Sequence, residues 1–160
     1  MDSEFALPEA EDDSDRKLLS DIEEYGWHVV FVAEEPDTPR FAFTVGLYYR
    51  YAHPEILVMG LRQPTAHSLL HSMVARIQHG ERFESGAFIT GIASFPLALV
   101  PVHTDHFREY LGYGIWFYRS LSAPFPALQL VWPDGSGLFP WQSSYDVRFN
   151  GLQRVLHRAS

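Results

Sequence analysis

Apolar residues recur along this chain with two different periods, and the period separates helical segments from strands. Within residues 16–25, Leu18 and Ile22 lie four positions apart and therefore share one helical stripe. Ser14 or Asp15 stands in front of this stripe as a suitable N-cap. We therefore predict a first helix over residues 16–25.

A second and longer helical stripe lies in the middle of the chain, where Pro64 suits the first turn of a helix. The apolar residues that follow share one helical face, and they are Ala66, Leu69, Leu70, Met73, Val74 and Ile77. Residues 106–121 repeat the helical spacing, although Gly112 and Gly114 each cost a helix about 1 kcal/mol relative to alanine. We predict a helix over residues 64–79 and another over the later segment.

Short segments rich in β-branched and aromatic residues predict the strands. Residues 27–33 and 41–48 flank a polar turn with two prolines, so we expect them to pair as a hairpin. Residues 55–60 form an apolar run of strand length. One or two further strands are expected in residues 84–101, with an interruption at Pro96.

The C-terminal part of the chain predicts a closing hairpin. Residues 127–132 are typical of a buried strand, residues 133–137 of its turn, and residues 138–141 of a partner strand. Because hairpins replace regular alternation of strands and helices, the order favours an α+β fold with a mostly antiparallel sheet and about three helices. Partial closure into a split-barrel-like sheet is an open alternative.

Charge is concentrated at the start of the chain. The formal net charge is −8, and seven of the 20 acidic residues precede Arg16, whereas the other 13 nearly balance the 12 basic residues. We expect residues 1–14 to be a disordered acidic tail and residues 15–160 to be a single domain. The domain carries no basic stripe, so nucleic acid is not an expected partner.

The chain lacks cysteine, which excludes disulfides, thiolate nucleophiles and cysteine-based metal sites. Its longest apolar stretch, residues 89–102, contains prolines and falls short of the about 20 residues that a membrane-spanning helix needs. The acidic first residues do not resemble an export signal. We expect a cytoplasmic protein that makes no membrane contact.

Familiar catalytic signatures are missing from the sequence, including the nucleophile elbow, the P-loop, the dinucleotide fingerprint and the zinc-binding helix. His53 and Glu55 flank Pro54 at a predicted loop-to-strand junction, where scaffolds often present functional groups. The two side chains could act as an acid–base pair. A structural turn explains the same residues better, and the acid–base site is the alternative.

Two pairs of histidines have spacings that metal sites use. His67 and His71 lie four residues apart in the second predicted helix, and His103 and His106 lie near the start of the third. Neither pair has a third ligand nearby in the sequence, so a solvated helix edge and a capping turn explain them better. We expect no bound metal.

Aromatic residues exceed the needs of a core of this size, and several fall in predicted loops. Indole and phenol rings can stack on planar ligands or fill a partner's pocket, although they could also cap the end of the core. The candidate ligand-binding residues are Tyr49, Arg50, His53, Gln129, Trp132, Asp134 and Trp141.

Several short motifs occur together in this chain, including FAFTVGL, HPE, LQLVWPD and FPW. They occupy residues 26–27, 41–47, 53–55, 60–61, 128–134, 137 and 139–141. As a combined pattern they resemble a bacterial family known as domain of unknown function 4262, over roughly residues 18–155. The resemblance implies a small cytosolic domain with no assigned activity, substrate or cofactor. Gln142 follows the FPW motif where the family pattern has an acid, so no carboxylate role is carried over there.

Three functional hypotheses remain open at this point. The favoured one is a non-enzymatic binding module whose aromatic-lined face takes a protein or a small planar ligand. The second is an enzyme that uses His53 and Glu55 with a flavin or a metal. The third is an immunity or antitoxin-like protein, suggested by small size and the acidic tail. The sequence requires no cofactor and leaves the oligomeric state open.

Overall fold

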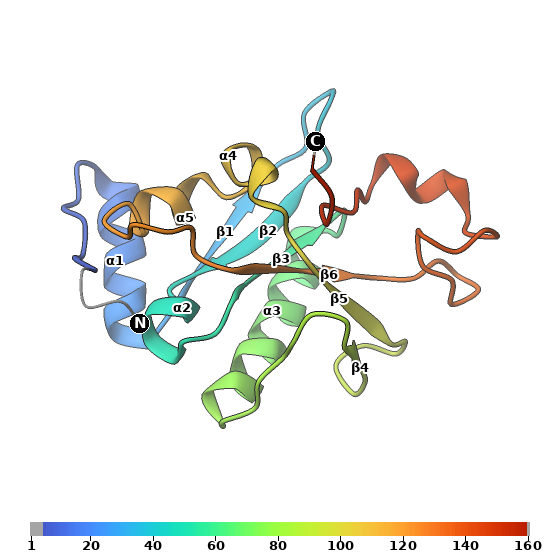
Figure 1. Ribbon diagram of the computed structural model, residues 1–160, viewed down its shortest axis with the longest axis horizontal. Coiled ribbons are helices and arrows are strands. Elements are labelled where there is room, and N and C mark those ends of the chain that lie inside the picture. Colours follow the sequence, from blue (N-terminus) through green and yellow to red (C-terminus); the bar gives the residue numbers. More distant parts are fainter. Residues whose placement is uncertain (1–4, 160) are drawn as a thin grey trace.

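The computed structural model describes residues 5–159, and its centre is one six-stranded sheet in the order β1-β2-β3-β6-β5-β4 (Figure 1). The strands are β1 (His28–Val32), β2 (Phe41–Val45), β3 (Glu55–Met59), β4 (Phe88–Ile89), β5 (Leu97–Pro101) and β6 (Ala127–Val131). Neighbouring strands are antiparallel except β3 and β6, which are parallel. The predicted α+β fold is confirmed, but the sheet stays open between β1 and β4, so the split-barrel-like closure is wrong.

Helices cover both faces of the sheet. The helices are α1 (Asp13–Tyr25), α2 (Leu47–Tyr51), α3 (Gln63–Gln78), α4 (Phe107–Tyr110) and α5 (Gly112–Phe117), with short 3-10 turns η1 (Thr104–His106) and η2 (Val147–Gly151). The α3 helix covers one face with its predicted apolar stripe, all of which is buried. The α1, α4 and α5 helices cover the opposite face (Figure 1). No helix in residues 5–159 combines the length and the apolarity needed to span a bilayer.

The first helix begins three residues earlier than predicted. Asp12 is its N-cap, since the carboxylate accepts a hydrogen bond from the Asp15 N–H at 2.8 Å. Gly26 ends the helix with a left-handed φ of 93°, which a residue with a side chain rarely adopts. An acid therefore takes the cap position, where it also complements the helix dipole.

The segment before α1 lies against the domain from residue 5 onwards. The Phe5 ring packs on Tyr49 and Phe117, with ring centroids 5.1 and 5.5 Å apart. The Ala6 N–H donates to the Ser120 hydroxyl at 2.8 Å. Phe5 and Ala6 thus contact the domain, while residues 1–4 of the predicted disordered tail lie outside the described residues.

The third predicted helix, over residues 106–121, is divided into η1, α4 and α5. The chain bends at Leu111, whose φ and ψ of −122° and 37° are not helical, and the buried Leu111 side chain joins the core. Gly114 is required in α5, because a β-carbon there would lie 2.6 Å from the Phe125 ring. Tertiary packing therefore decided a boundary that the apolar spacing did not reveal.

Two other loops differ from the predictions. The tyrosine-rich segment at residues 48–51 is part of α2, which begins after Gly46 in a left-handed conformation with φ 109°. Residues 138–141 form no strand, so the predicted closing hairpin is wrong. Both segments are instead organised by buried or half-buried carboxylates.

Candidate functional site

Glu55 is a fully buried carboxylate placed at the start of α2. Its Oε2 accepts hydrogen bonds from the N–H groups of Gly46 and Tyr48, each at 3.1 Å. Its Oε1 accepts the Leu47 N–H at 3.2 Å. These are free N–H groups of a helix N-terminus, where an anion is electrostatically favoured. Glu55 therefore explains why so short a segment as residues 47–51 is helical.

Two hydroxyl groups complete the surroundings of Glu55. The Thr44 hydroxyl donates to Oε1 at 2.7 Å and accepts the Ile56 N–H at 2.9 Å. The Tyr118 hydroxyl donates to Oε2 and accepts the Tyr49 N–H at 3.1 Å. Three of the five groups around the carboxylate are backbone N–H donors, and each of the two hydroxyls accepts another backbone N–H and so directs its own proton to Glu55. Burial raises the pKa of Glu55, while the five donated hydrogen bonds oppose that rise and favour the carboxylate.

His53 is equally inaccessible and is a neutral imidazole. Its Nε2 accepts the Phe83 N–H at 2.9 Å, which requires a lone pair on that nitrogen. Its Nδ1 lies 2.8 Å from the Pro54 carbonyl oxygen and therefore donates to it. Burial lowers the pKa of His53, consistent with this tautomer. The ring fastens the segment around residue 83 to the turn before β3.

His53 and Glu55 therefore do not form the acid–base pair that their spacing suggested. Each side chain is 0% exposed and is satisfied by its own separate partners. A general base must reach a proton of the substrate, and neither group has a free polar atom directed to solvent. The structural turn is the interpretation of these residues that the hydrogen bonds support.

Gln129 and Trp132 of the predicted binding face are also structural. The Gln129 amide pairs with the Arg154 carbonyl at 2.6 Å and with the Leu156 N–H at 2.8 Å. The indole N–H of Trp132 donates to the Met59 carbonyl at 2.7 Å. These bonds fasten the C-terminal segment and β3 to β6.

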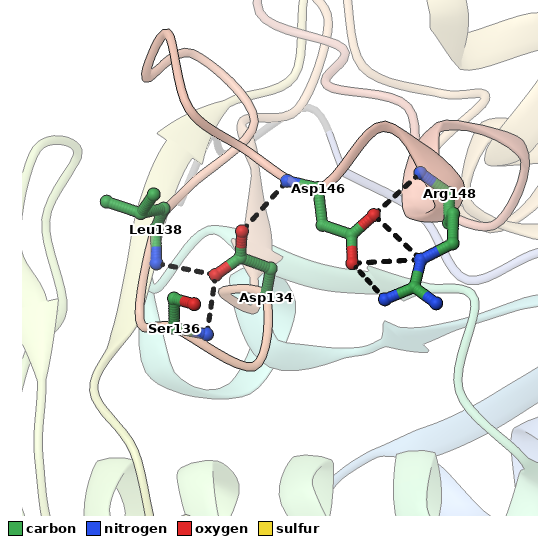
Figure 2. Close-up of polar contacts among 5 residues, drawn as sticks. All are labelled: Asp134, Ser136, Leu138, Asp146 and Arg148. Carbon is green, nitrogen blue, oxygen red and sulfur yellow. Dashed lines mark hydrogen bonds and ion pairs between the residues drawn. The ribbon is translucent and has the colours of Figure 1, made fainter.

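Asp134 organises the loop where a hairpin was predicted (Figure 2). Its Oδ1 accepts the N–H groups of Ser136 and Leu138, each at 2.9 Å, and its Oδ2 accepts the Asp146 N–H at 2.8 Å. These backbone donors, chiefly Leu138, lower the pKa of Asp134. Asp146 in turn forms an ion pair with Arg148 at 2.7 Å. One carboxylate thus holds both ends of the segment that carries Phe139 to Trp141.

The predicted aromatic face does not converge on one surface. Tyr49 packs between Phe5 and Phe117, and Arg50 donates to the Ile22 carbonyl at 3.4 Å. Both residues belong to α2, which lies at the opposite end of the molecule from the loop after β6 (Figure 1). A single patch formed by α2, His53 and the last loop is therefore wrong.

The two histidine pairs lie in different surroundings, and neither pair is part of a metal site within residues 5–159. His71 packs edge-on against Trp27 at 4.8 Å, and the two rings of His67 and His71 are 6.4 Å apart. His103 accepts the Asp105 N–H, and His106 contacts the Arg158 carbonyl at 2.7 Å. Within residues 5–159, no three potential ligands of the His, Cys, Asp or Glu type come together.

Trp141 is the exception among the predicted site residues, because its ring is exposed beside a hollow. The side chain is 47% exposed and stacks on Phe139, with centroids 5.2 Å apart and planes 6° apart. Phe88 of β4, 64% exposed, meets the same Phe139 ring at 5.6 Å. A hollow of about 330 Å³ adjoins Trp141, and its other lining residues are Pro140, Val155, His157 and Arg158.

Sequence reasoning missed Phe88, His157 and Arg158 at this position. Phe88 lies in a two-residue strand, and the other two residues are in a C-terminal segment without regular structure. None of the three has a local sequence signal, because only the fold brings Phe88 against Phe139 and places His157 and Arg158 beside Trp141. The half-exposed Trp141 ring therefore has the Arg158 guanidinium and the His157 imidazole beside it at this hollow.

Residues 5–159 thus form a small open-sheet α+β domain with internal carboxylate clamps and an exposed Trp141 ring stacked on the buried Phe139. A family model described as a domain of unknown function (DUF4262) matches residues 21–146. The chain therefore belongs to this family. No curated protein and no solved structure matches it.

The motifs that carry the family resemblance are largely internal supports. Thr44, His53, Glu55 and Asp134 all accept or donate hydrogen bonds within the domain. Within those same motifs, Trp141 is the aromatic side chain that reaches the surface. The polar residues of these motifs thus hold the fold together, and Trp141 is the aromatic residue among them whose side chain is exposed to solvent.

Proposed function

We propose that this protein is a non-enzymatic binding module, and that its ligand is a small planar anion held at the Trp141 hollow. The exposed Trp141 ring, which stacks on the buried Phe139 beside the exposed Phe88, carries the proposal. Indole faces stack on planar rings, and Trp141 already lies parallel to Phe139, so its outer face is available to a further ring.

The charge around the hollow favours an anion. His157 and Arg158 line it together with Pro140 and Val155, and no acidic residue does. Neither the His157 ring nor the Arg158 guanidinium forms an ion pair within residues 5–159. A guanidinium pairs with a carboxylate or a phosphate through two parallel hydrogen bonds, which favours these groups over a neutral ligand.

The hollow is also held in place by the surrounding structure. Asp134 fixes the loop that carries Trp141 through three backbone hydrogen bonds. On the other side, the His106 ring contacts the Arg158 carbonyl at 2.7 Å. Preorganised walls lower the entropy that binding would otherwise lose. A volume of about 330 Å³ is sufficient for a ring of one or two cycles.

The test uses naphthalene-2-carboxylate as the probe and naphthalene-2-carboxamide as its neutral counterpart, in isothermal titration. We expect the carboxylate to bind to the wild-type protein. Arg158→Gln should weaken its affinity about tenfold or more, since a charge-assisted hydrogen bond contributes about 1.5–3 kcal/mol. Trp141→Ala should abolish the binding, and Trp116→Phe on α5 should leave it unchanged. Equal binding by wild type and Trp141→Ala, or no binding at millimolar probe, would contradict the proposal.

A further inference from the structure

The strand β1 is an edge of the sheet whose outer backbone groups have no partner. It pairs with β2 on one side only, from His28 with Val45 to Val32 with Phe41. Antiparallel pairing uses the N–H and C=O groups of alternate residues, so the remaining residues of β1 direct theirs away from β2. None of these outward groups has a hydrogen-bond partner within residues 5–159.

The start of this edge forms the floor of a small groove between α1 and α3. A hollow of about 190 Å³ lies at the start of β1, between Lys17 and Asp21 of α1 and His71 of α3. Trp27 and Val29 line its inner side. The walls are rigid, because Asp21 bonds both Lys17 and His28 at 2.7 Å and Trp27 packs on His71 at 4.8 Å.

The β1 edge lacks the features by which proteins protect an exposed edge strand. Its five residues, HVVFV, include no lysine, no proline and no bulge, and all five are partly exposed. The opposite edge is different, because β4 has only two residues. An unprotected strand edge with apolar side chains on both faces is a template for a further strand.

Charge at the far end of β1 indicates the polarity of what would bind. Glu34 and Glu35 follow the strand directly, and both are exposed. Neither forms an ion pair within residues 5–159. An opposite charge on a neighbouring strand stabilises pairing, so these carboxylates favour a lysine or arginine in the added segment.

We propose that an extended segment of a partner protein adds to β1 as a seventh strand in the groove between α1 and α3. Main-chain hydrogen bonds to the outward groups of β1 hold the segment. An apolar side chain near one end fills the hollow beside Trp27, and a basic side chain near the other end meets Glu34 and Glu35. This site lies at the edge of the sheet opposite β4 and does not depend on the Trp141 hollow.

The first test measures amide hydrogen exchange in the presence of a synthetic nine-residue peptide. The peptide alternates valine and threonine and has a phenylalanine near one end and two lysines at the other. At about ten times its dissociation constant, the peptide should slow the outward amides of β1 about tenfold. A peptide with N-methyl groups on the residues that face β1 keeps its side chains and should lose this effect. Equal protection by both peptides would overturn strand addition.

The second test examines the side-chain contacts by a charge exchange. The double substitution Glu34→Lys and Glu35→Lys should weaken binding of the lysine peptide severalfold. It should strengthen binding of a peptide that has glutamates in place of the lysines. His71→Trp should fill the hollow and weaken the binding of both peptides. The control His79→Ala, an exposed residue at the end of α3, should change the affinity for neither peptide. If wild type and the double variant show the same preference between the lysine and the glutamate peptide, the proposal is overturned. Concentration-dependent dimerisation that protects the same amides without any peptide would do so too, since the occupant would then be a second copy.

Discussion

The Tyr118 hydroxyl donates a hydrogen bond to the Glu55 carboxylate, and the two residues are 63 positions apart in the chain. Both side chains are buried, and the contact joins the end of α5 to the start of β3. Because Glu55 also holds the N-terminus of α2, one carboxylate links helices on a face of the sheet to two strands. The polar centre of the domain therefore acts as an internal support.

Glu55→Gln should destabilise the domain by about 3 kcal/mol, because the amide nitrogen faces donors and leaves buried N–H groups unsatisfied. Urea unfolding followed by circular dichroism measures the change. Tyr118→Phe removes one donor and keeps the carboxylate, so it should cost less, about 1–2 kcal/mol. A variant Glu55→Gln as stable as wild type would contradict the assignment of an ionised, five-donor site.

Gly60→Ala should destabilise the domain by about 3 kcal/mol, because strain and a clash act together. Gly60 has φ +85°, and a β-carbon there would lie 2.3 Å from the Leu152 carbonyl oxygen. Gly91 is a matched control, since it has the same φ of +85° and nothing within 4 Å. Gly91→Ala should therefore show only the conformational cost of about 1 kcal/mol. Equal losses in urea unfolding would show that the Leu152 contact is unimportant.

His53 should make the stability of the domain fall as the pH is lowered below about 6.5. Burial lowers the pKa of folded His53 below the ordinary value of 6.5. The unfolded chain therefore binds a proton first, and stability is lost between pH 6.5 and the lower folded pKa. Well above pH 6.5 the residue is neutral in both states and contributes no slope.

The measurement for His53 is the urea midpoint of wild type and His53→Gln between pH 7.5 and pH 5. We expect a shallower pH dependence in His53→Gln. Identical slopes in wild type and His53→Gln would mean that folded His53 binds its proton as readily as the unfolded residue does.

Asp134→Ala should release the loop of residues 133–148 while leaving the sheet folded. The loop depends on three backbone N–H groups that donate to this carboxylate (Figure 2). Limited proteolysis should cut this loop faster, and the binding at Trp141 should weaken with it. Asp146→Ala removes the ion pair with the exposed Arg148 and should change cleavage little. Equal cleavage in wild type and Asp134→Ala would contradict this account of the loop.

The apolar pattern predicted the regular elements well where one face of an element is buried. The α3 stripe, the β1–β2 hairpin and the central strands β3 and β6 all follow from period and residue type. Predictions failed at residues 106–121 and 138–141, where the structure depends on Phe125 packing against Gly114 and on the Asp134 carboxylate. These are contacts with particular partners, which local periodicity does not encode.

The sequence by itself determined the fold class, the single sheet and the family, because burial of an apolar face imposes a period that can be read locally. Only the tertiary structure decided which polar and aromatic side chains are buried with internal partners and which are exposed to solvent. His53 and Glu55 look catalytic in sequence but become internal supports, whereas Trp141 remains at the surface. The physical reason is that a side chain's availability depends on partners distant in the chain, and those partners are set only when the strands take their order in the sheet.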